Sequence, residues 1–241
     1  MVELPHSGSK NELLSRLSPR QYQWFWDNST QVELKFGEVL TPADSPIKHV
    51  YFPRKAFISM LVAVPDAPAI EMGLIGNEGM LGASLALGNK RAPMQAVVQG
   101  AGSALRMDTD VFCLRVQTNA ALRNLIHAYL YVLFIQLAQA GACNCFHDVH
   151  QRLARWLLMT HDRAHSDHFH LTHQFLATML GVRRSAVTIA AGHLQHQGMI
   201  TYSRGQIQVV SRSKLLDSSC ACYGQAIDSY QQNLTQHIRL C

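Results

Sequence analysis

The sequence predicts an α+β protein with an N-terminal β-roll of the jelly-roll type, a long helix and a C-terminal winged helix-turn-helix. Short apolar or alternating runs separated by turn residues occur between residues 32 and 107, and a long apolar stripe follows. Residues 172–210 then contain a helix, a glycine turn, a second helix and a two-strand hairpin. We therefore predict four segments, which are 1–110, 111–145, 146–222 and a C-terminal tail at 223–241.

The first of these segments combines helices with strands. Residues 11–28 have the pattern of one or two amphipathic helices, and Pro19 is expected to begin the second, because proline favours the first turn of a helix. The β-prone runs that follow indicate the strands of the roll, which are 32–36, 49–52, 56–64, 70–75, 95–98 and 103–107.

The segment 111–142 has apolar residues three to four positions apart, which predicts one long helix. A stripe of this length exceeds what one small domain needs, so we predict a homodimer through this helix; packing onto the chain's own roll is the alternative. A hinge is expected at 141–144, followed by an amphipathic helix over 147–163. The predicted dimer contacts are Leu122, Ile126, Tyr129, Leu133 and Leu137.

The segment 172–210 has the order of elements found in a winged helix-turn-helix. Thr172 is a suitable N-cap for the first helix, and Gly181 supplies the tight turn before the second helix begins near Arg183. The run 203–206, Ser-Arg-Gly-Gln, is a hairpin signal with a cationic tip. The alternative is a three-helix packing module with solvated arginines.

The second helix of this motif presents small and basic residues outward, which suits a DNA major groove. Five basic residues and no acid occur from Arg183 to Lys214. An arginine fork can bind guanine through two hydrogen bonds, whereas the same side chain on a phosphate adds affinity without sequence information. We predict that duplex DNA is contacted by Thr172, Gln174, Arg183, Arg184, Ser185, Thr188 and Arg204.

Composition agrees with a globular, mildly basic protein. The 241 residues are 48% hydrophobic and 15% charged, with a formal net charge of +5. The N-terminus lacks the apolar core of a secretion signal, and the apolar run 128–142 is too short to span a bilayer, so we expect a cytoplasmic protein without a membrane partner. Glycine-rich phosphate loops, Gly-x-Ser-x-Gly and His-Glu-x-x-His are missing from the sequence, so no enzyme is predicted.

Six cysteines are present, and a cytoplasmic protein should keep them reduced. Cys143 and Cys145 with His147 and His150, or the pair Cys220 and Cys222, could bind a soft metal or act as a redox switch. Their one-residue spacing is tighter than that of a zinc knuckle, so we predict neither a metal site nor a resident cofactor. The histidine-rich segment 161–173 has the pattern of a polar surface loop.

The motif FLATMLGVRRSAVT at 175–188 and the run GMLGASLALGNKRAPMQAVVQ at 79–99 resemble the Crp/Fnr superfamily of bacterial transcription regulators over most of the chain. The resemblance implies a cyclic-nucleotide-binding-like roll and implies that Arg184 reads DNA bases. Ser185 and Ile189 depart from neighbouring family positions, so the operator should differ. RNA polymerase is a candidate partner of such a regulator.

The resemblance also locates a small-molecule effector pocket in the roll. Arg91 precedes Ala92 where the family has an Arg-Ser pair for phosphate, and 82–84 lack the carboxylate that holds the ribose, which argues against cyclic AMP. The candidate pocket residues are Glu78, Gly82, Ser84 and Arg91. No cysteine precedes Cys113, so an N-terminal iron–sulfur cluster is not expected. The alternative function is an effector-binding or scaffold protein whose helix-turn-helix contacts other proteins.

Overall fold

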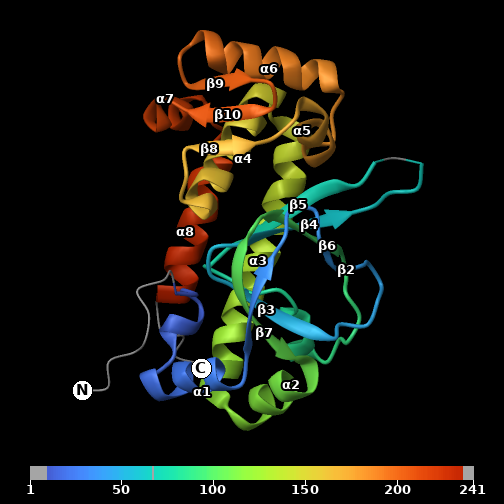
Figure 1. Ribbon diagram of the computed structural model, residues 1–241, viewed down its shortest axis with the longest axis vertical. Helices are drawn as coiled ribbons and strands as arrows, with labels where there is room; N and C mark the ends of the chain where they lie inside the picture. The colour runs from blue at the N-terminus through green and yellow to red at the C-terminus, as the bar shows by residue number, and fades with distance from the viewer. Residues whose placement is uncertain (1–9, 67, 236–241) are drawn as a thin grey trace. The chain divides into compact units, whose positions relative to one another are not determined.

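The computed structural model describes residues 10–66 and 68–235 (Figure 1). The start of the predicted segment 1–110, the end of the predicted tail 223–241 and Cys241 lie outside these residues. Two compact units are present: Met1–Ile58 with Ile75–Ile126, and Ser59–Leu74 with His127–Cys241. Each unit is described by itself.

The first unit begins with a 3-10 turn η1 (Leu14–Arg16) and helix α1 (Pro19–Asp27). Ser18 caps α1 in a capping box with Gln21, which confirms the helix start predicted at Pro19. Buried Asn11 donates from Nδ2 to the carbonyl oxygens of Pro53 and Gly79, both at 2.9 Å, and so ties the N-terminal segment to the roll.

The roll contains two groups of strands, in which the pairs β1–β7, β3–β7 and β2–β6 are antiparallel. One sheet has the order β1-β7-β3, formed by β1 (Thr30–Leu34), β7 (Gly102–Asp108) and β3 (His49–Pro53). The other has the order β2-β6-β4-β5, formed by β2 (Val39–Thr41), β6 (Gln95–Gly100), β4 (Phe57–Val62) and β5 (Ile70–Ile75). The six predicted strands are confirmed within a few residues, whereas β2 was not predicted because three residues carry too little pattern.

Aromatic packing joins the helices of the first unit to its sheet. The ring of Phe52 on β3 lies 5.4 Å from that of Phe25 on α1 and 6.3 Å from that of Phe112, measured between centroids. Phe112 belongs to α2 (Thr109–Thr118), and a 3-10 turn η2 (Ala83–Leu87) precedes β6. All three rings are buried.

The predicted long helix is divided at Asn119. Helix α3 runs from Ala120 to Phe146, and Asn119, which is extended, accepts a hydrogen bond from the backbone NH of Leu122 at 3.0 Å. An asparagine that caps a following helix interrupts the preceding one, so one continuous helix over 111–142 was wrong. The hinge predicted at 141–144 was also wrong, because helical geometry continues through Gly141 to Phe146.

The second unit contains helices α4 (Val149–Ala164), α5 (His173–Leu180), α6 (Arg184–His196), α7 (Arg212–Ser218) and α8 (Cys222–Thr235). Its sheet has three strands in the order β8-β10-β9, which are β8 (His168–His170), β10 (Gln206–Val209) and β9 (Ile200–Ser203). The prediction of a two-strand wing was therefore incomplete. Residues 223–235, predicted as a tail, are helical.

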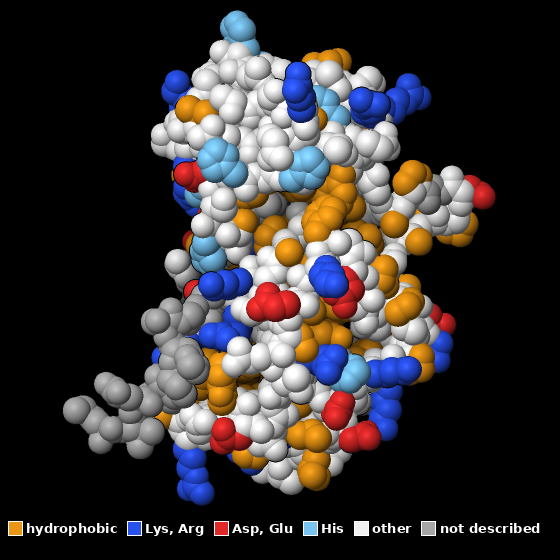
Figure 2. Space-filling model, in the orientation of Figure 1, with side chains coloured by type: hydrophobic (Ala, Val, Ile, Leu, Met, Phe, Trp, Pro, Cys, Tyr) orange, Lys and Arg blue, Asp and Glu red, His pale blue; other side chains and the backbone are white. Residues whose placement is uncertain are grey.

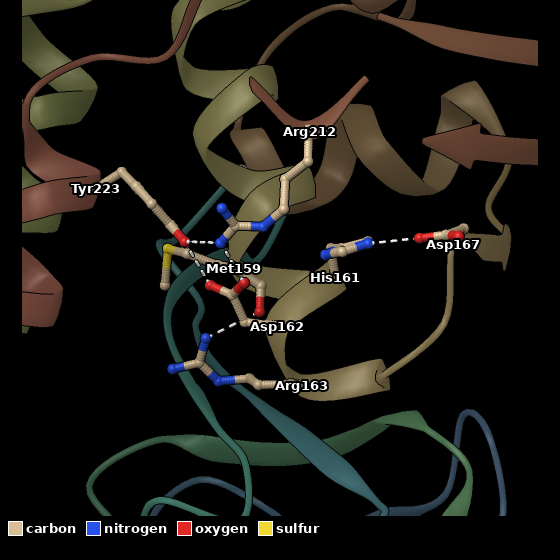
Figure 3. Close-up of polar contacts among 7 residues, drawn as sticks. All are labelled: Met159, His161, Asp162, Arg163, Asp167, Arg212 and Tyr223. Atoms are coloured by element: carbon tan, nitrogen blue, oxygen red, sulfur yellow. Dashed lines mark hydrogen bonds and ion pairs between the residues drawn. The ribbon is translucent and has the colours of Figure 1, made fainter. Parts of the chain in front are cut away.

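A polar cluster connects α4 to α7 and α8 (Figure 3). Asp162 on α4 accepts hydrogen bonds from Arg212 Nη2 at 2.8 Å and from Tyr223 Oη at 2.7 Å. Arg212 also donates to Tyr223 Oη at 2.6 Å. Burial and the neighbouring carboxylate raise the pKa of Tyr223 to about 12, so its hydroxyl remains a donor at neutral pH.

Helix α3 is long and apolar enough, by length and composition alone, to cross a membrane. Its most apolar 18-residue window has a mean hydropathy of 1.4, and 28% of that window is buried. The expectation that this run is too short was therefore wrong, since the helix extends beyond 128–142. The other residues of this window are partly buried or exposed.

Candidate nucleic-acid interface

Helix α5 begins and ends with the predicted signals. The Thr172 hydroxyl accepts a hydrogen bond from the backbone NH of Phe175 at 3.1 Å, which is the expected N-cap contact. Gly181 has a φ of +63°, a conformation that other residues adopt only with strain. A Cβ there would lie 2.6 Å from the Cδ1 of Ile70, so the turn requires glycine on two counts.

Helix α6 presents its basic end to solvent. Arg183 occupies the N-cap position and Arg184 the first helical position, and both side chains are exposed. Ser185 and Thr188 are also exposed, as predicted. The opposite face of α6 is buried and consists of Val187, Ala190, Ala191 and Leu194.

His173 belongs to this surface, although the sequence placed it in a polar loop. Its ring stacks on Tyr202 of β9, with centroids 4.2 Å apart and planes 16° from parallel. Its Nδ1 lies 2.9 Å from Thr188 Oγ1 on α6, and Thr188 donates in turn to the carbonyl oxygen of Arg184. Burial, with a contribution from Arg184, lowers the pKa of His173, so this ring stays neutral while it joins α5, α6 and β9.

The wing has a two-residue turn with the predicted cationic tip. Arg204 and Gly205 have φ values of +50° and +81°, as a type I′ turn requires. Gln195 of α6 accepts from the backbone NH of Tyr202 at 3.1 Å and so fixes β9 to the helix. Arg204, the first residue of this turn, is exposed.

The surface formed by α5, α6 and the wing is basic. Figure 2 shows Lys, Arg and His side chains over this end of the second unit. The exposed residues predicted to contact DNA all occur here, namely Thr172, Gln174, Arg183, Arg184, Ser185, Thr188 and Arg204. Positive charge without neighbouring carboxylates attracts a polyanion.

The candidate effector residues each have a local structural role in the roll. Arg91 forms an exposed ion pair with Asp44, with Nε and Oδ1 2.7 Å apart, and this contact lowers the pKa of Asp44. Glu78 accepts a hydrogen bond from the backbone NH of Gly76 at 3.1 Å. Gly82 has a φ of +93° and precedes η2, in which Ser84 lies. Arg91 thus has a carboxylate partner at the position where a phosphate ligand was predicted.

The predicted dimer contacts on α3 are mostly internal. Leu122, Ile126 and Tyr129 are fully buried within the chain, and Leu133 and Leu137 are partly buried. Because these side chains are covered by other residues of the chain, the dimer contacts are better sought among those that remain exposed. The apolar side chains that remain exposed on α3 include Tyr131, Phe134 and Phe146.

A buried carboxyl connects the β4–β5 hairpin to α4. Glu71 accepts from Ser59 Oγ at 2.6 Å and from Trp156 Nε1 at 2.9 Å. Although part of the residue is exposed, its carboxyl group is desolvated, and this raises its pKa from 4.5 to about 7. No sequence pattern predicted this site, because its three residues come from separate elements.

Four potential metal ligands meet where α3 ends and α8 begins. The sulfurs of Cys143 and Cys220 are 3.6 Å apart, and Cys222 Sγ lies 3.6 Å from His147 Nδ1. The sets proposed from sequence were therefore incomplete. Cys145 is exposed, and the ring of His150 packs against that of His193 with centroids 5.5 Å apart.

Comparisons with known proteins agree with this geometry. Residues 151–218 match the Crp-like helix-turn-helix domain family. A comparison with curated proteins gave no match.

Similar solved structures include a putative crp/fnr family transcriptional regulator from Eubacterium rectale, with 15% identity, a TM-score of 0.67 and coverage of 86% of this chain and 96% of that one. FixK2 from Bradyrhizobium japonicum has 15% identity, a TM-score of 0.68 and coverage of 80% and 98%. The c-di-GMP responsive global regulator CLP of Xanthomonas campestris has 14% identity, a TM-score of 0.63 and coverage of 83% and 99%.

Residues 151–218 therefore carry a Crp-like helix-turn-helix domain, and the chain is similar in fold to solved regulators of the Crp/Fnr family.

Proposed function

We propose that the protein binds a palindromic duplex site as a homodimer, with α6 of each copy in a major groove. The observation that carries the proposal is the exposed, basic N-terminal end of α6, held beside the wing by His173 and Tyr202. Recognition helices contact base edges with their N-terminal residues. Arg183 and Arg184 are therefore assigned to the bases, with Ser185 beside them.

The remaining contacts are assigned to the phosphates. Thr172 accepts the hydrogen bond of its own cap, so its hydroxyl proton is available for a phosphate oxygen. Gln174 is exposed on the same first turn, and Arg204 extends from the wing. The Thr188 hydroxyl is already hydrogen-bonded to His173 and to the carbonyl oxygen of Arg184. We therefore assign Thr188 to the positioning of α6 and not to a contact with DNA.

The dimer is assigned to the exposed face of α3. His127, Tyr131, Phe134, Ala138 and Ala142 are exposed, and they recur at intervals of four, three, four and four residues. The first three intervals have the alternating spacing of three and four residues that a two-helix coiled-coil seam requires. This exposed face replaces the internal stripe that was predicted from sequence as the dimer contact. We assign its apolar side chains to a second copy and not to lipid, in keeping with a cytoplasmic regulator.

Selection of binding sites from a random duplex library tests this proposal. The recovered site should contain two symmetric halves about 34 Å apart, and log K should fall steeply with log salt. The double variant Arg183→Ala/Arg184→Ala should lose at least about thirtyfold in specific affinity, since each base contact contributes about 1–3 kcal/mol.

The matched control removes two charges elsewhere, at the exposed residues Arg20 and Lys35. Arg20→Ala/Lys35→Ala should retain the specific affinity of the parent. A library that yields no enriched site, together with binding that ignores salt, would favour the scaffold alternative.

A further inference from the structure

We propose that Cys143, His147, Cys220 and Cys222 bind one thiophilic divalent ion, and that Zn²⁺ fits best. One ligand atom from each residue can be chosen so that all four atoms lie within 4.8 Å of one another. Three cysteines and one histidine form a common structural zinc set. This inference concerns a site separate from the DNA surface and does not depend on the proposed function.

The measured separations suit a tetrahedral ion. With Zn–S bonds of about 2.3 Å, two thiolates of a regular tetrahedron lie about 3.8 Å apart, and a thiolate and an imidazole nitrogen lie about 3.6 Å apart. Cys143 Sγ and Cys220 Sγ are separated by 3.6 Å, and Cys222 Sγ and His147 Nδ1 by 3.6 Å. Two of the distances between ligand atoms that a tetrahedral site requires are therefore already present.

The backbone sets up both halves of the site. His147 lies one helical turn after Cys143, and its backbone NH donates to the Cys143 carbonyl oxygen at 3.2 Å. Cys220 lies between α7 and α8, and Cys222 is the first residue of α8. Each half supplies two ligands from a short stretch of chain, and 77 residues separate Cys143 from Cys220.

The surroundings also suit a bound cation with thiolate ligands. Cys143, Cys220 and Cys222 are at most 4% exposed, whereas Cys145 on the same helix is exposed. Gln139 Nε2 lies 2.9 Å from Cys222 Sγ and can donate to it, as groups around a metal commonly do for a bound thiolate. Arg155 interacts electrostatically with Cys143 and Cys220 and offsets the negative charge of three thiolates around one divalent ion.

Two other uses of these cysteines explain less of the arrangement. A Cys143–Cys220 disulfide would leave the contact between Cys222 and His147 without a role. An iron–sulfur cluster distributes its four ligands over two or four iron atoms, so its most distant ligand atoms lie farther apart than those of ligands that share one ion. Binding of one ion accounts for all four side chains and releases the thiol protons to solvent.

A bound ion would cross-link two parts of the second unit that lie on either side of the helix-turn-helix in the chain. Helices α4 to α7 and the wing lie in the chain between the two halves of the site, so the ion would join the end of α3 to the start of α8. Removing a ligand present at about a thousandfold excess over its Kd should lower the melting temperature by about 10 °C.

Metal analysis of the full-length protein tests the site. Protein purified with reductant and dialysed against buffer without chelator should retain one Zn²⁺ per chain. Replacement by Co²⁺ should give the visible bands of a tetrahedral ion and thiolate charge-transfer absorption. Cys220→Ser should lose both signals, whereas the matched control Cys145→Ser should retain them.

A conservative ligand change guards against a variant that fails to fold. Cys222→His should still bind Co²⁺, with an altered spectrum and weaker charge-transfer absorption. The proposal is overturned if the parent protein holds no Zn²⁺ or Co²⁺, if Cys145→Ser loses metal as Cys220→Ser does, or if intact mass shows a Cys143–Cys220 disulfide under reductant.

Discussion

The arginines of the roll and those of the helix-turn-helix differ in their electrostatic surroundings. Arg91 in the roll is paired with Asp44 at 2.7 Å, whereas Arg183 and Arg184 stand at the start of α6 in a stretch without acidic residues up to Lys214. An arginine next to a carboxylate is already neutralised, while one without such a neighbour is free to attract phosphate and base acceptors. The comparison therefore separates an arginine in a surface ion pair from the two arginines that we propose to contact nucleic acid.

The largest expected effect concerns the proposed dimer, which pairs the α6 helices of two copies. Phe134→Glu places a charge in the exposed α3 seam, where Phe134 is 68% exposed in the single chain. Two like charges facing each other should separate the dimer, and sedimentation analysis should give a monomer with much weaker affinity for a palindrome. Leu114→Glu, at an exposed leucine of α2, is the control and should stay dimeric. A dimeric Phe134→Glu would rule out the seam.

Single substitutions should distinguish base reading from phosphate binding. Arg184→Lys removes the two-pronged guanidinium and should reduce discrimination between bases by about 1–3 kcal/mol at one position of each half-site. Arg204→Ala should weaken all sequences uniformly and reduce the slope of log K against log salt by about 1 per bound wing. Competition titrations with matched and mismatched duplexes measure both. Equal losses of discrimination in both variants would contradict these assignments.

Glu71 should make stability depend on pH. Its pKa is raised to about 7 in the folded chain, so the folded state holds a proton that the unfolded state releases near 4.5. The resulting stabilisation is complete below the unfolded pKa and is lost as pH rises through about 7. Glu71→Gln should remove this dependence and gain on the order of 2–3 kcal/mol relative to the parent at pH 8.

Denaturant unfolding at several pH values measures the effect of Glu71. The exposed carboxylate variant Glu33→Gln should leave the pH profile of the parent unchanged. A parent protein whose stability is constant between pH 5 and 8 would contradict the burial of the Glu71 carboxyl.

The smallest effect is expected in the roll. Arg91→Ala removes an ion pair in which both side chains are largely exposed, with relative exposures of 58% and 85%. Solvent screening leaves such pairs with little influence on stability, so the unfolding midpoint should not change measurably. A clear loss of stability would show that Arg91 holds the roll together by more than its contact with Asp44.

Local signals accounted for most of the secondary structure. Ser18 and Pro19 fixed the start of α1, Thr172 that of α5, and Arg204 with Gly205 produced the turn of the wing. These are effects of residues on their immediate backbone, so they can be read along the chain. Asn119 offered a comparable cap signal, but the apolar pattern on both sides of it dominated the prediction of one helix.

Sequence alone determined the order of the elements and the helix-turn-helix with the basic start of its second helix. It also showed that no acidic residue occurs from Arg183 to Lys214. Each of these features depends on residues that are neighbours in the chain. Only the tertiary structure decided which face of α3 is covered, that His173 stacks on Tyr202, and that Cys143 and His147 meet Cys220 and Cys222. Periodicity shows that a helix has an apolar face but does not show what covers it. Contacts between distant parts of the chain arise from packing, which leaves no repeating pattern in the sequence.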